Sequence, residues 1–125
     1  MLNTAKPLDI AARLTAPTHI KTQIISYLRR RSGISLIEMC RDIIGFSGDV
    51  DWFLVEKNLM IWTGISREAC VAMTELIIDG EIEPTITTPL VYLYDGEMLS
   101  LPVGNRMASY KKPTWVPMVF AGGDE

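Results

Sequence analysis

Histidine and cysteine, two residue types that often serve in catalysis and in metal sites, are scarce in this 125-residue sequence. It contains one histidine, His19, and two cysteines, Cys40 and Cys70, neither of which has a CxxC partner. A general acid or base must be held beside a partner in a pocket, and no such partner stands near His19. Both cysteines lie in apolar stretches typical of free buried thiols, and the sequence lacks glycine-rich phosphate motifs and a nucleophile elbow. We therefore expect no enzymatic activity, no cofactor and no metal site.

Charge is unevenly distributed along the chain, although the net charge is only −3. Residues 1–31 carry a net charge of +5, residues 32–103 carry −9, and residues 104–125 carry +1. A phosphate backbone attracts the two basic ends and repels the acidic middle. The alternative is that both basic ends are simply exposed to water. In the first of them, the positive charge would interact favourably with the dipole at the C-terminal end of a helix. The candidate DNA contacts in these ends are Arg29, Arg30, Arg31, Lys111 and Lys112.

The elements that must position these residues begin with two helices. Apolar residues recur at helical spacing over residues 19–31 and predict a first helix there. Ser35 and Glu38 form a capping-box pattern, which predicts a second helix over residues 35–44. Residues 1–17 contain two prolines and no sustained pattern, so we expect an N-terminal arm.

Two further helices are predicted over residues 50–62 and 67–79, joined by a short turn that ends at Ser66 as an N-cap. Apolar side chains cover nearly every face of the first, so we expect it to be buried. Helices joined by so short a turn cross steeply, as in a helix-turn-helix. Residues 91–101 hold an Asp-Gly pair between apolar runs, which favours a β-hairpin. The expected fold class is α+β, with about four helices followed by a small antiparallel hairpin.

The residues Trp-Thr-Gly-Ile-Ser-Arg-Glu-Ala-Cys over 62–70, and those over 76–82, resemble the turn, recognition helix and exit of winged helix-turn-helix proteins. The same string is similar to small phage and prophage regulators and to the N-terminal domains of phage replication initiators. The likeness covers roughly residues 35–101. It implies a winged-helix domain over residues 18–103, in which the hairpin is the wing and the last helix lies in the major groove of duplex DNA.

The resemblance also implies which side chains contact DNA. Arg67 is the base or phosphate contact, and Ser66 and Thr74 make lesser polar contacts. The implied function is that of a non-enzymatic DNA-binding protein, a small transcription regulator or replication accessory of the phage type. The acidic residues of segment 32–103 oppose DNA binding, because they repel phosphates and because Arg67 is the single basic residue of the predicted recognition helix. The alternative is a winged-helix module that binds a protein, as an inhibitor or DNA mimic, through its acidic face or its apolar tail.

The predicted C-terminal tail, residues 104–125, is apolar and aromatic over much of its length, and such side chains are costly to leave in water. The tail therefore packs back on the domain or contacts another chain, and its exchange between two subunits would make a homodimer. No apolar stretch is long enough to span a membrane and no signal-peptide pattern is present, so we expect a cytoplasmic protein. The candidate partner-binding residues are Trp115, Val116, Met118 and Phe120.

Overall fold

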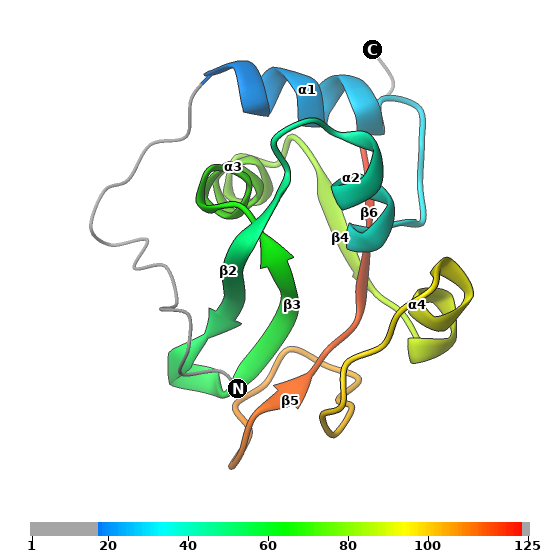
Figure 1. Ribbon diagram of the computed structural model, residues 1–125. Helices are drawn as coiled ribbons and strands as arrows, with labels where there is room; N and C mark the ends of the chain where they lie inside the picture. The colour runs from blue at the N-terminus through cyan, green and yellow to red at the C-terminus, as the bar shows by residue number, and fades with distance from the viewer. Residues whose placement is uncertain (1–17, 124–125) are drawn as a thin grey trace.

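The computed structural model describes residues 18–123, which form an α+β fold with four α-helices and two three-stranded sheets (Figure 1). The predicted arm over residues 1–17 lies outside this range. Within it, no helix is long and apolar enough to cross a membrane. The helices are α1 (Thr18–Leu28), α2 (Leu36–Asp42), α3 (Arg67–Ile78) and α4 (Pro89–Asp95), with a 3-10 turn, η3 (Val55–Lys57). The strands are β1 (Ile34–Ser35), β2 (Ser47–Leu54), β3 (Leu59–Ile65), β4 (Glu83–Ile86), β5 (Thr114–Trp115) and β6 (Met118–Ala121).

One sheet joins the segments before α2 and after α3 to the end of the chain. Its strand order is β1-β6-β4, and both pairs are antiparallel. The central strand is β6, where Phe120 stands opposite Ile34 of β1 and opposite Pro84 of β4. The tail expected beyond residue 103 therefore supplies the central strand of this sheet, and the predicted boundary does not separate it from the domain.

The second sheet, β2-β3-β5, contains the largest correction to the sequence analysis. The helix predicted over residues 50–62 is wrong, because β2 and β3 form an antiparallel hairpin there. Asn58, with φ of 51°, supplies the left-handed turn between them. The helix-turn-helix expected from residues 50–62 and 67–79 is therefore absent. Residues 59–62 are all buried, so the apolar run reflects a strand covered on both faces.

The β-hairpin predicted over residues 91–101 is also wrong. That segment begins within α4, which has Pro89 in its first turn, where the missing N–H has no helical partner to lose. Gly96, with φ of 119°, follows the helix in the left-handed region that favours glycine. The pair Asp95-Gly96 thus ends a helix, and it does not form the two-residue turn of a hairpin.

The other three predicted helices, α1, α2 and α3, are confirmed, and two of them begin as the sequence pattern indicates. The Ser35 hydroxyl oxygen accepts a hydrogen bond from the Glu38 N–H, and the Glu38 carboxylate accepts one from the Ser35 N–H. The Ser66 hydroxyl oxygen accepts from the Ala69 N–H at the start of α3. These bonds join residues close in sequence, so they do not depend on the rest of the fold.

The core is aromatic, and the C-terminal segment helps to fill it. The rings of Trp62, Tyr92 and Trp115 lie 4.7 to 5.8 Å apart between centroids. The Tyr92 hydroxyl donates to the Met118 carbonyl (2.6 Å) and accepts from the Leu36 N–H (3.1 Å). Because the tail packs within its own chain, tail exchange does not support the homodimer, which stays a prediction. The residues predicted to bind a partner are buried core residues, which corrects that assignment: Trp115, Val116, Met118 and Phe120.

Candidate nucleic-acid interface

α3 and its N-cap residue carry the three side chains that the resemblance assigns to DNA, and most of this helix is enclosed. Residues 69–73 are all buried, and five consecutive residues of an α-helix point to every side of its axis. Both α1 and β2 pack against α3, which lies between them in Figure 1. The middle of α3 therefore offers no free face to a major groove.

Ser66 serves the fold at the junction between β3 and α3. Its hydroxyl oxygen accepts from the Ala69 N–H (3.0 Å), which satisfies one of the unpaired donors at the helix start. The same hydroxyl donates to the Gly45 carbonyl (2.7 Å). Because both its donor and an acceptor position are used within the protein, Ser66 is a structural residue and a poor candidate for DNA contact.

On α3 itself, Thr74 and Arg67 differ in how exposed their side chains are. Thr74 is half-buried, and its hydroxyl donates to the Cys70 carbonyl one turn earlier (2.9 Å). Arg67 is exposed in the first turn, next to the exposed Glu68. Of the three side chains predicted on α3, Arg67 alone is exposed to a ligand, and its charge is opposed by its neighbour.

The first basic cluster, Arg29, Arg30 and Arg31, follows directly after α1. The Arg31 guanidinium lies 4.4 Å from the centroid of the Tyr27 ring, a cation–π contact. Arg30 has a left-handed backbone, with φ of 62°, and its N–H donates to the Gly123 carbonyl (2.9 Å). The cluster therefore lies where α1 and the C-terminal end meet, at the upper end of the molecule in Figure 1.

The second basic cluster contains cations of the tail together with Lys57, which is far from them in sequence. Tyr110 donates its N–H to the Lys57 carbonyl (2.8 Å), and the Asn58 side-chain amide donates to the Tyr110 carbonyl (3.0 Å). The Tyr110 hydroxyl donates to the Arg106 carbonyl (2.7 Å). These bonds hold the tail beside the turn of the β2–β3 hairpin. We name the four exposed cations gathered there the basic patch: Lys57, Arg106, Lys111 and Lys112.

The fold fixes the backbone of the basic patch at two points. Asn58 adopts its left-handed conformation, and its carbonyl accepts from the Thr114 N–H (2.9 Å), where β5 runs parallel to β3. Gly104 packs directly against the Tyr110 ring, and a Cβ atom there would collide with the Tyr110 hydroxyl. The segment that carries the tail cations is therefore a packed loop.

The electrostatics of the basic patch suit an anionic partner. No ion pair joins any of its four cations to a carboxylate within residues 18–123, where both described ion pairs involve other residues. Glu56 is the one acidic residue in segments 55–58 and 104–113. Unpaired surface cations bind phosphate with release of counterions. The sequence pointed to the tail cations but not to Lys57, which no local pattern connects to them.

A different surface is apolar. α4 and the turn after it expose large side chains, of which Tyr94 is 92% exposed. Asp95 and Glu97 stand beside them, so this surface is unsuited to DNA. The exposed apolar residues are Leu90, Leu93, Tyr94 and Met98.

No known family model, curated protein or solved structure matches this chain. The choice between surfaces therefore depends on the geometry and the charge of residues 18–123. Two of the three predicted side chains on α3 have structural roles, whereas the predicted tail lysines belong to an exposed basic patch.

Proposed function

We propose that the protein is a non-enzymatic winged-helix DNA-binding protein, of the small phage regulator or replication accessory type, which contacts duplex phosphates through the basic patch. The winged-helix part is supported by the order of the elements. In sequence, α1, β1, α2 and α3 precede β4 and β6, and the sheet order β1-β6-β4 places the last strand in the centre. This order agrees with that of a winged helix in which the β2–β3 hairpin is inserted between α2 and α3. Residues 87–117, which connect β4 to β6, then take the place of the wing.

The DNA-binding part of the proposal depends on one observation, the gathering of four exposed, unpaired cations at one end of the molecule. Three of them belong to the segment that takes the place of the wing, and Lys57 belongs to the inserted hairpin. Contacts of lysine and arginine with phosphates position a protein on DNA without reading its sequence. We therefore expect salt-sensitive binding, in which Arg67 at the exposed end of α3 adds at most one contact.

Fluorescence polarisation of a labelled random-sequence duplex, titrated with the protein from about 50 mM salt upwards, tests this proposal. The patch variant is the double substitution Lys111→Ala/Lys112→Ala. Its matched control, Arg29→Ala/Arg31→Ala, removes the same charge from the opposite end of the molecule. Each phosphate contact contributes about 0.9 to the slope of log affinity against log salt, so the patch variant should lower the slope by about 1.8. The control should leave the slope unchanged.

Two results would contradict the proposal. Equal losses in the two variants would show that net charge, and not the basic patch, governs the interaction. No binding of the wild-type protein even at low salt would exclude DNA as the ligand. It would favour the alternative, a winged-helix module that binds a protein. Because the apolar tail is buried, the acidic face or the exposed apolar face of α4 would then be the candidate surface.

A further inference from the structure

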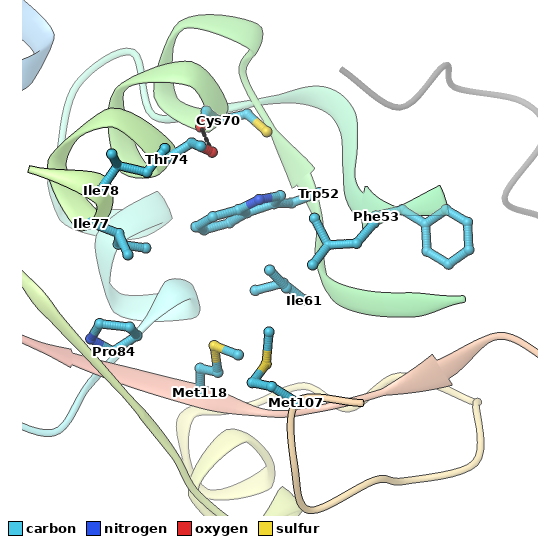
Figure 2. Close-up of a pocket in the computed structure, with 11 residues that line it drawn as sticks. Trp52, Phe53, Ile61, Cys70, Thr74, Ile77, Ile78, Pro84, Met107 and Met118 are labelled. Atoms are coloured by element: carbon cyan, nitrogen blue, oxygen red, sulfur yellow. Dashed lines mark hydrogen bonds between the residues drawn. The ribbon is translucent and has the colours of Figure 1, made fainter. Parts of the chain in front are cut away.

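An apolar pocket lies between α3, the β2–β3 hairpin and the β4–β6 pair (Figure 2). Its volume is about 210 Å³, and none of its eleven lining residues is charged. Dry cavities with apolar linings bind molecules as small as benzene, and larger pockets of this kind hold small organic ligands. The pocket is therefore of a size and character that suits a small uncharged molecule.

The pocket has a buried floor and a rim open to solvent. Ile61 and Met118 are 4% and 5% exposed, and they form its floor together with Trp52. At the rim, the side chains of Ile78 and Met107 are 71% and 49% exposed. A ligand can thus enter from solvent and lose most of its contact with water once inside.

One polar group in the pocket has no partner. The Trp52 side chain is 6% exposed, yet its indole N–H makes no hydrogen bond with any residue that the structure describes. The Trp52 nitrogen is not among the fully buried unpaired atoms of residues 18–123, so this N–H keeps contact with solvent and is free to donate to a ligand that enters the pocket. In Figure 2 the indole crosses the pocket with its nitrogen on the edge facing α3. The Trp115 indole N–H is also unpaired, but it is fully sealed from solvent.

Thr74 adds an acceptor on the same side. Its hydroxyl hydrogen is committed to the Cys70 carbonyl, which leaves oxygen lone pairs available to a donor. An ionised ligand is disfavoured, because an uncompensated charge in an apolar site pays a large desolvation cost. The lining therefore selects an uncharged molecule that is mostly apolar and carries one oxygen.

We propose that this pocket binds a small uncharged aromatic molecule whose single carbonyl or hydroxyl oxygen accepts a hydrogen bond from the Trp52 indole N–H. The pocket shares no residue with the basic patch, although Met107 at its rim follows Arg106 of the patch, and the proposal does not depend on DNA binding. The aromatic part of the ligand would lie among Ile61, Met107 and Met118, and sulfur atoms pack favourably against aromatic rings.

Nuclear magnetic resonance of the full chain tests the proposal, because the three tryptophans give separate indole N–H signals. Acetophenone is the probe, since it pairs one aromatic ring with one carbonyl. It should shift the Trp52 signal to saturation and leave the Trp115 signal in place. Benzoate, with the same ring and a negative charge, should cause no shift. Trp52→Phe identifies the signal and, by removing the hydrogen bond, should weaken acetophenone binding about fivefold, as measured on the methyl signals of lining residues.

A pair of rim variants provides the matched control. Ile78→Lys places a charge at the mouth of the pocket, on a side chain exposed enough for the fold to survive, and should weaken acetophenone binding at least about fivefold. Ile44→Lys makes the same change at a residue that is 87% exposed and does not line the pocket, and should leave binding unchanged. The proposal is overturned if acetophenone causes no saturable shift of the Trp52 signal, or if benzoate binds equally well.

Discussion

Two of the regions predicted to contact DNA, α3 and the segment that carries the basic patch, differ in how accessible the rest of the fold leaves them. α3 carries the sequence likeness to a recognition helix, yet residues 69–73 are buried on every side. The basic patch matches no motif, yet its four cations are exposed and unpaired. The difference shows that a likeness along the chain can identify a helix, whereas its accessibility depends on what packs against it.

The largest expected effect comes from a substitution in the enclosed part of α3, which tests whether this helix is buried. Val71→Lys places a charge at a side chain that is 3% exposed, and it should lower the free energy of unfolding by about 3–5 kcal/mol. Glu68→Lys is the control on the same helix, because Glu68 is exposed, and its effect should stay within about 1 kcal/mol. Urea denaturation followed by tryptophan fluorescence measures both. Equal small effects would mean that α3 is open to solvent.

Thiol labelling compares the interior of α3 with a less buried position. Burial raises the pKa of Cys70 to about 12, and it also raises the pKa of Cys40 on α2, which is only half-buried. Since the thiolate is the reactive form and Cys70 is the more enclosed thiol, Cys70 should react with a disulfide reagent at pH 8 at least about tenfold more slowly than Cys40. Its rate should rise about tenfold per pH unit, because the thiolate fraction grows in proportion below the pKa. Similar rates for the two thiols would contradict an enclosed α3.

The smallest expected effect separates structural from binding roles at the start of α3. Ser66→Ala removes the helix cap and the bond to the Gly45 carbonyl, and it should lower the free energy of unfolding by about 1–2 kcal/mol. DNA affinity should not change in the polarisation assay. Ser32→Ala, at an exposed position without such bonds, is the control for stability. A loss of DNA affinity in Ser66→Ala, with stability unaffected, would restore α3 as the binding element.

Local patterns predicted three helices because their signals lie within a few residues. The capping box of Ser35 and Glu38 and the cap at Ser66 join backbone and side chains that are neighbours in sequence. The apolar spacing of residues 67–78 then indicates a helix, although not how many of its sides are covered. Both the element and its start are therefore readable, whereas its burial on every side is not.

The β2–β3 hairpin could not be distinguished from a buried helix by its pattern. A strand covered on both faces loses the alternation of apolar and polar residues, and residues 59–62 are all buried. The turn between the strands uses Asn58 in a left-handed conformation, without the Asn-Gly or Asp-Gly pair that signals a tight hairpin. Asp-Gly pairs occur instead at Asp79-Gly80 and Asp95-Gly96, where they end α3 and α4.

By itself, the sequence determined that this chain has an α+β fold, where three of its helices lie, and that its cations concentrate near its two ends. Only the tertiary structure decided that the aromatic tail belongs to the core, that Lys57 joins the tail cations, and that Trp52 faces a pocket without a hydrogen-bond partner. The reason is the range of the interactions involved. Capping and helical spacing act within one or two turns, whereas burial and the gathering of charge depend on contacts between segments far apart in the chain.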